Sequence, residues 1–164
     1  MKYSIVKLPH FSGNKASVYS VVRYGDDETF LEKFVNTNGN SFISETKDII
    51  GRLYTIGHTT GARHGFFRHD EGALGDGVCA LYDKKKSKLR LYCIRYGLQI
   101  IIIGDGGPKK VRALQHDEKL LETNAFMKWL SSRITERIKN HEIRYINDAL
   151  DFTGDFDFDN KENE

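Results

Sequence analysis

The chain has 164 residues, of which 39% are apolar, 29% charged and 12% aromatic, and its formal net charge is +2. This composition excludes a disordered or collagen-like chain and predicts one domain with its own hydrophobic core. The longest apolar run, residues 98–103, is far shorter than the roughly 20 residues that span a bilayer. Residues 1–7 lack the apolar core of a signal peptide. We therefore expect a cytoplasmic protein that does not enter a membrane.

The charge is divided unevenly along the chain. Residues 151–164 carry a net charge of −5, which leaves +7 on residues 1–150. This division predicts a single basic domain over 1–150 and an acidic C-terminal tail over 151–164. The tail is interpreted either as a solvated terminus or as a segment that folds over the basic face.

The N-terminal half predicts strands and two helices. Residues 3–8 and 16–24 are rich in β-branched and aromatic residues and indicate strands. Asp26-Asp27 is a candidate N-cap for a short helix that ends near Asn38-Gly39. Ser44 is a candidate N-cap for a second helix that ends at Gly57. Two consecutive amphipathic helices indicate a helical hairpin lying on a sheet.

The second half begins with a glycine-rich stretch, residues 57–77, which predicts a long loop. Residues 78–82, 88–96 and 98–103 predict a three-stranded antiparallel meander, and the four consecutive isoleucines of the third strand indicate burial on both faces. A helix is expected over about 117–140, and residues 143–158 have only weak alternation. Cys79 and Cys93 lack metal-site spacing and are expected to be reduced, buried thiols.

A basic and aromatic cluster lies on and around the meander. Arg90 stands between Leu89 and Leu91 inside a strand, a position where an arginine requires a specific role. Cations that bind phosphates and rings that stack on bases are typical of RNA-binding sheets. The cluster comprises Tyr82, Lys84, Lys85, Lys86, Lys88, Arg90, Tyr92, Arg95, Tyr96, Lys109, Lys110 and Arg112. For residues 84–86 the alternative is a soluble turn that discourages pairing of sheet edges.

Two further patterns are candidate sites. Residues 104–110, Gly-Asp-Gly-Gly-Pro-Lys-Lys, lack the spacing of a phosphate-binding loop and are interpreted as a tight turn that places two lysines at the sheet end. His58, His64 and His69 do not have the spacing of a helical metal-ligand pair, so neither a metal nor another cofactor is predicted. One of these histidines could still serve as a general acid or base.

The segment 88–96, followed by the apolar strand and the Lys109-Lys110 pair, resembles the RelE/ParE superfamily of toxin–antitoxin toxins, in particular its phage-derived HigB-like branch. The matching pattern runs from about residue 16 to 140 and is specific at Arg90, Tyr92 and the two lysines. The resemblance implies an α+β fold. In this fold, an antiparallel sheet of about four to five strands packs against an N-terminal helical hairpin and a C-terminal helix.

The resemblance also implies a function. Such a toxin cleaves messenger RNA on the ribosome without a metal, by attack of a ribose 2′-hydroxyl on the adjacent phosphate, and a cognate antitoxin neutralises it. Arg90 would hold the phosphate, Lys109 or Lys110 would assist, and Tyr92, His64 or His69 would transfer protons. The expected RNA-binding residues are Lys84, Lys85, Lys86, Lys88, Arg95 and Arg112.

Other functions stay open because the chain is longer than the usual toxins of this family. It could be a non-catalytic binding protein, such as a gyrase inhibitor or a protein-interaction module. It could also be a member of the superfamily whose toxic activity has been lost or replaced.

Overall fold

The computed structural model describes residues 1–68, 77–81, 88–109 and 117–161. Its main helices are α1 (Phe30–Asn38), α2 (Ile43–Thr55) and α3 (Glu118–Lys139), with a π-helix, η1 (Ile56–Thr60), and a 3-10 helix, η2 (His64–Phe66). Its strands are β1 (Lys2–Lys7), β2 (Ser17–Arg23), β3 (Phe67–Arg68), β4 (Val78–Leu81), β5 (Leu89–Tyr96), β6 (Ile100–Pro108), β7 (Ile143–Ile146), β8 (Asp151–Gly154) and β9 (Asp157–Asp159). None of the helices in these ranges has the length and apolar character of a membrane span.

The main sheet has seven strands in the order β3-β4-β5-β6-β2-β1-β9. All neighbouring pairs are antiparallel except β2 and β6, which are parallel. The expected antiparallel sheet of four to five strands, packed against an N-terminal helical hairpin and a C-terminal helix, is therefore wrong. The parallel pair could not be read from alternation, because alternation defines the two faces of a strand but not its neighbour.

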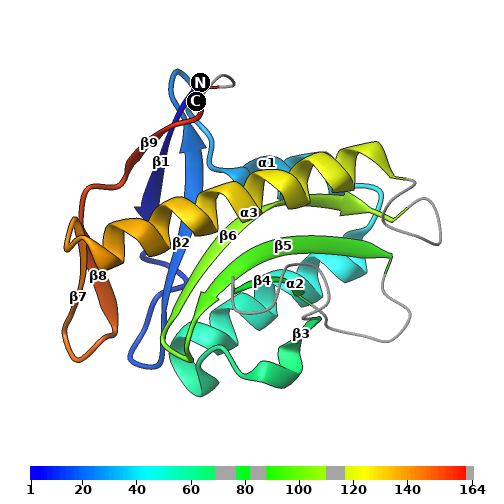
Figure 1. Cartoon of the computed structure of the whole chain (residues 1–164). Helices are drawn as coiled ribbons and strands as arrows, with labels where there is room; N and C mark the ends of the chain where they lie inside the picture. The colour runs from blue at the N-terminus through cyan, green and yellow to red at the C-terminus, as the bar shows by residue number, and fades with distance from the viewer. Residues whose placement is uncertain (69–76, 82–87, 110–116, 162–164) are drawn as a thin grey trace.

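Helices cover both faces of the sheet (Figure 1). α1 and α2 pack on one face, against side chains such as Val18, Leu91 and Ile103. α3 packs on the other face, against Tyr92, Ile102 and their neighbours, and the β7–β8 hairpin contributes to this second core. The isoleucines of β6 alternate between the two cores and are fully buried, which confirms the expectation of a strand covered on both faces.

The helix boundaries follow from local capping. Thr29, rather than Asp26 or Asp27, is the N-cap of α1, and it forms a capping box with Glu32. α2 begins at Ile43 without a side-chain cap, so the Ser44 prediction is wrong. Asp117 caps α3 by accepting a hydrogen bond from the Leu120 amide at 3.3 Å, and the helix begins about where the sequence predicted it.

The acidic C-terminal segment is part of the fold. β8 pairs with β7, and β9 adds to the free edge of β1, so residue 150 is not a structural boundary. The start of β1 and the end of β9 lie side by side, with the Asn160 amide donating to the Met1 carbonyl at 2.9 Å (Figure 1). The segment pairs with β1 rather than with β5, the strand that carries Arg90 and Arg95. The reason is hydrogen bonding: an unpaired strand edge accepts another strand whatever its charge.

Cys79 and Cys93 lie directly opposite each other on β4 and β5, with their sulfur atoms 3.5 Å apart. Both are free thiols and both are buried. Burial, together with the neighbouring Cys79 thiol, raises the pKa of Cys93 well above its ordinary value.

We expect neither thiol to react with a thiol-specific reagent at neutral pH while the protein is folded, because both thiols are buried and the raised pKa of Cys93 suppresses its thiolate. Titration with Ellman's reagent before and after addition of guanidinium chloride measures this. Two thiols should appear only after unfolding, and rapid labelling of either cysteine in the native protein would contradict the prediction.

Candidate nucleic-acid interface

The candidate interface lies where β5 begins, β6 ends and α3 begins, all at one end of the molecule (Figure 1). Leu89 pairs with Pro108 in the sheet, and the Lys109 amide donates to the Lys88 carbonyl at 2.8 Å. Lys88 and Lys109 are therefore held next to each other by the antiparallel register. We call this region the basic end; it comprises Lys88, Arg90, Lys109 and Lys119.

Arg90 points from β5 toward the face that α3 covers. Its neighbours Leu89 and Leu91 belong to the opposite core, so alternation fixes its direction. The residue directly across from it on β6 is Gly107, and a Cβ atom there would lie 3.7 Å from the Lys119 Nζ. Because Gly107 has no side chain, the lysine of α3 can approach the same patch of sheet that Arg90 faces.

Asp105 adds a carboxylate to the basic end. Its Oδ2 lies 3.8 Å from the Lys119 Nζ, and its Oδ1 accepts the Gly106 amide at 2.8 Å. Both side chains are partly exposed, so the ion pair itself contributes little stability. The Asp105 carboxylate can nevertheless accept a proton, and the Lys119 ammonium beside it can bind an anion.

A β-bulge positions Asp105. Between Leu91 and Cys93 the register shifts, so that Gly104 and Asp105 of β6 both lie opposite Tyr92 of β5. Gly104 lets α3 pack closely on this part of β6, because a Cβ there would displace the Met127 side chain of α3. Residues 104–108 are thus the last part of β6, and their interpretation as an exit turn is wrong. Bulges of this kind often re-aim side chains next to functional sites.

A cavity of about 300 Å³ borders the basic end. It lies between the end of α1, the end of β6 and the start of α3. Its lining includes one aromatic ring, several hydroxyl and amide groups, and the Lys119 cation that also belongs to the basic end. The lining residues are Thr37, Asn38, Ser41, Phe42, Pro108, Asp117, Lys119 and Leu120.

Glu45 of α2 stabilises this end of the sheet through hydrogen bonds. Its carboxylate accepts hydrogen bonds from the backbone amides of Lys88, at 3.0 and 3.1 Å, and Leu89, at 2.9 Å. Lys88 directly precedes β5 and Leu89 is its first residue. The carboxylate therefore fixes the entry of β5 relative to the helices, and Lys88 with it.

Of the expected site residues, Lys88, Arg90 and Lys109 meet at the basic end, but Arg90 is only 7% exposed. Tyr92 is completely buried against α3, which argues against direct contact with RNA. Arg95 lies on the opposite face of β5, where it donates to the Ala62 carbonyl at 2.7 Å and stacks over Phe67. Its side chain thus anchors the segment that precedes β3.

His64 begins η2, just before the edge strand β3, and β4 separates that strand from β5. It is exposed but is not brought together with Arg90. The remaining expected residues lie outside the described part of the chain: Lys84, Lys85, Lys86, His69, Lys110 and Arg112.

The sequence reasoning missed Lys119 and Asp105. Lys119 had a detectable signal, because it lies in the first turn of α3, where the helix dipole favours acidic residues. A lysine there suggests a bound anion or a nearby carboxylate. Asp105 had a weaker signal, because its position among glycines is also typical of a tight turn.

Comparisons with protein-family models, with curated proteins and with solved structures find no match to this chain. Its function is therefore inferred from the site.

Proposed function

We propose that this protein binds messenger RNA at the basic end and cleaves it, acting in the cytoplasm as the toxin of a toxin–antitoxin pair. The observation that carries the proposal is that Arg90 lies directly opposite Gly107 and the Lys119 ammonium lies over that glycine, beside Lys88 and Lys109. Cations grouped in this way attract the RNA backbone and stabilise charge that develops on a phosphate. The adjoining cavity is of a size and polarity that suit one nucleobase.

The proposed reaction needs no metal. The ribose 2′-oxygen attacks the adjacent phosphorus, the bond to the 5′-oxygen breaks, and a 2′,3′-cyclic phosphate results. Asp105 accepts the proton from the 2′-hydroxyl, and Lys119 and Arg90 stabilise the negative charge on the phosphate oxygens. Lys109 donates a proton to the departing 5′-oxygen. The cognate antitoxin would neutralise the protein by covering this end.

A second candidate is a non-catalytic binding protein, such as a gyrase inhibitor or a protein-interaction module. The observation that favours it is the burial of Tyr92 and Arg90, the two strand residues on which the toxin resemblance depends most. Incubating the full chain with RNA and, separately, with gyrase and supercoiled DNA distinguishes the two candidates. Cleaved RNA supports the nuclease, and loss of supercoiling without RNA cleavage supports the alternative.

Lys119→Gln is expected to weaken RNA binding about 3- to 10-fold near 0.1 M salt and to lower the salt dependence of binding by about one counterion. The variant removes one phosphate-binding charge from an exposed position, so stability should change little. Fluorescence anisotropy with a labelled single-stranded RNA over a salt series measures both effects. Lys128→Gln, an exposed lysine farther along α3, is the matched control and should bind like the wild type.

Arg90→Ala should abolish growth inhibition when the protein is expressed. Because Arg90 is buried, circular dichroism must show that the variant is folded. Full toxicity of a folded Arg90→Ala protein would show that Arg90 has no role in the reaction. Unchanged RNA binding by Lys119→Gln would show that RNA does not bind at the basic end.

A further inference from the structure

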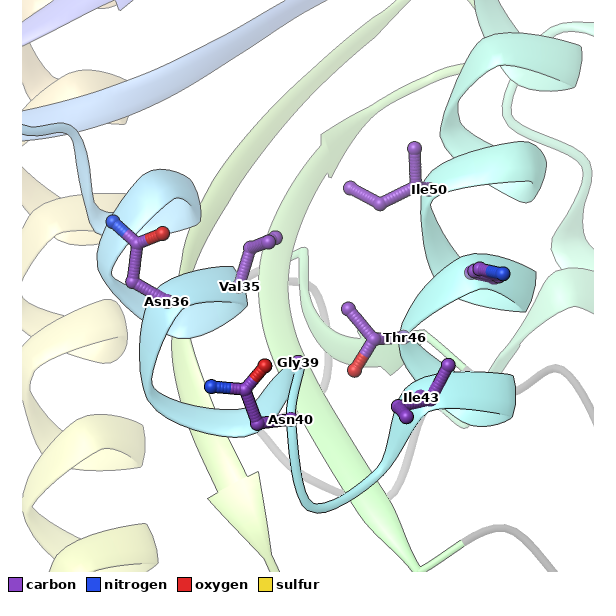
Figure 2. Close-up of a pocket in the computed structure, with 8 residues that line it drawn as sticks. Val35, Asn36, Gly39, Asn40, Ile43, Thr46 and Ile50 are labelled. Carbon is purple, nitrogen blue, oxygen red and sulfur yellow. The ribbon is translucent and has the colours of Figure 1, made fainter.

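A groove of about 440 Å³ runs between α1 and α2 on the outer surface of the helical layer. Val35 of α1 and Ile50 of α2 face each other across it, and Thr46 projects from α2 toward α1 (Figure 2). Asn36, Gly39, Asn40, Ile43 and Lys47 complete the lining. The groove shares no residue with the cavity at the basic end, so it is a separate site.

Within the part of the chain that the structure describes, the Thr46 side chain in this groove lacks a hydrogen-bond partner. The residue is only 5% exposed, and its buried hydroxyl has no hydrogen-bond partner among the described residues. A buried hydroxyl without a partner destabilises the protein, so native structures usually satisfy such groups. Its position on the groove lining indicates that a bound partner supplies the missing hydrogen bond.

An exposed stripe on α2 extends the groove beyond the size of a small ligand. Ile43 and Tyr54 are 57% and 46% exposed, and Ile50 lies between them on the same side of the helix. Together with Lys47 these residues recur at helical spacing over about 16 Å of helix axis. Ile43 and Tyr54 are exposed and Ile50 is half-buried, and apolar side chains spaced in this way over three turns are typical of a surface that receives another helix.

Lys47 specifies the charge of the occupant. It is the one charged residue in the groove lining, it is exposed, and no acidic side chain among the described residues pairs with it. A second copy of this chain is a poor occupant, because two-fold packing of α2 on itself would bring two Lys47 side chains close to the axis. An occupant that places a carboxylate near Lys47 complements the groove.

We propose that the α1–α2 groove binds an amphipathic helix of a partner protein, with apolar residues between Val35 and Ile50, a polar group at Thr46 and an acidic residue beside Lys47. The proposal does not depend on RNA cleavage, because none of these residues belongs to the basic end.

The test uses the full chain and a display library of 16-residue helical peptides, with apolar residues at helical spacing and the other positions randomised. Selection on the wild type, with counter-selection on the Ile43→Ser/Ile50→Ser variant, should enrich peptides that carry Asp or Glu more often than Lys or Arg. Enriched peptides should bind the wild type at least tenfold more tightly than the variant, and Lys47→Glu should reverse their charge preference. Leu98→Ser, which changes an equally exposed apolar residue in the β5–β6 turn, should bind like the wild type.

Thr46→Val separates binding from folding. Because the valine removes an unpartnered hydroxyl, the melting temperature of the free protein should stay the same or rise by about 2–4 °C. The affinity for the enriched peptides should nevertheless fall by about tenfold. No enrichment, no preference for acidic peptides, or equal binding by Thr46→Val would overturn the proposal. A dimer that Ile43→Ser dissociates would overturn it in favour of a second copy of the chain.

Discussion

Gly57→Ala is expected to lower the free energy of unfolding by about 3 kcal/mol or more, and the melting temperature by about 6–12 °C. A Cβ at position 57 would lie 1.7 Å from the Phe11 carbonyl oxygen. The obstacle is backbone, which cannot rotate away as a side chain can. Gly57 also accepts hydrogen bonds from the Lys15 and Ala16 amides, which fix the start of β2.

The structural reason is a crossing of two chain segments. Residues 11–16 pass directly over η1, and Gly13 meets the same crossing, where a Cβ would lie 2.7 Å from the Gly57 carbonyl. Added volume at either glycine must separate the β1–β2 connection from the end of α2. Because both segments lead into buried elements, the disturbance reaches the core.

Gly51→Ala provides a matched control six residues away. Gly51 lies inside α2, is exposed, and would place its Cβ in open space. Here the same substitution should stabilise the protein by about 0.5–1 kcal/mol, because alanine favours the helix. Urea denaturation of the wild type, Gly57→Ala and Gly51→Ala measures the expected loss of stability in the first variant and the expected gain in the second. Equal effects at the two positions would show that the crossing at Gly57 is not as close as described.

Asp151→Asn is expected to cost about 2 kcal/mol of stability at neutral pH. The carboxylate is 14% exposed and accepts hydrogen bonds from Lys7 at 2.7 Å, Ser17 at 2.6 Å and Asn147 at 3.0 Å. These bonds join β1, β2 and the β7–β8 hairpin. Burial by itself raises the pKa of Asp151, but the three hydrogen bonds and the Lys7 charge outweigh it and hold the pKa at about 2.

The pH dependence follows from this lowered pKa. The folded protein holds Asp151 ionised more strongly than the unfolded chain, whose carboxyl has an ordinary pKa of 3.8. The stabilisation is therefore complete above about pH 4 and is lost as the pH falls through 2. The stability difference between wild type and Asp151→Asn should shrink over the same interval.

Urea denaturation at several pH values from 7 down to 2.5 measures this difference. Asp148→Asn is the control: it removes an exposed carboxylate in the same hairpin, at a positive φ that asparagine also tolerates, and should have little effect. A difference for Asp151→Asn that stays constant down to pH 2.5 would show that its charge does not contribute to stability.

Several elements were readable from local pattern. The isoleucine run of β6 predicted a strand buried on both faces, and apolar residues at helical spacing predicted α3 over about 117–140, because burial leaves signals within a few residues. The extension of β6 through residues 104–108 was not readable. Glycine and proline usually end strands, and only packing against Met127 and the Arg90 backbone explains why they continue one here.

The sequence predicted only part of the candidate site, because only some of its residues leave a local signal. The sequence marked Arg90, Lys88 and Lys109, because charged residues in or beside apolar strands stand out. Lys119, which reaches the basic end from another element, left only the weaker signal of a lysine in the first turn of a helix. The sequence could not show that Tyr92 points into the core while Arg95 binds the Ala62 carbonyl, because the bulge and the packing of β3 decide those directions.

The uneven distribution of charge along the chain illustrates what local sequence can and cannot predict. By itself the sequence determined that residues 1–150 are basic, that residues 151–164 are acidic, and which segments are apolar enough to be buried. Only the tertiary structure decided that the acidic segment forms two strands, that one of them completes the sheet beside β1, and that Asp151 binds Lys7 and Ser17. Composition is a property of single residues. Strand partners and ion pairs depend on which distant segments meet, and this is settled when the whole core packs.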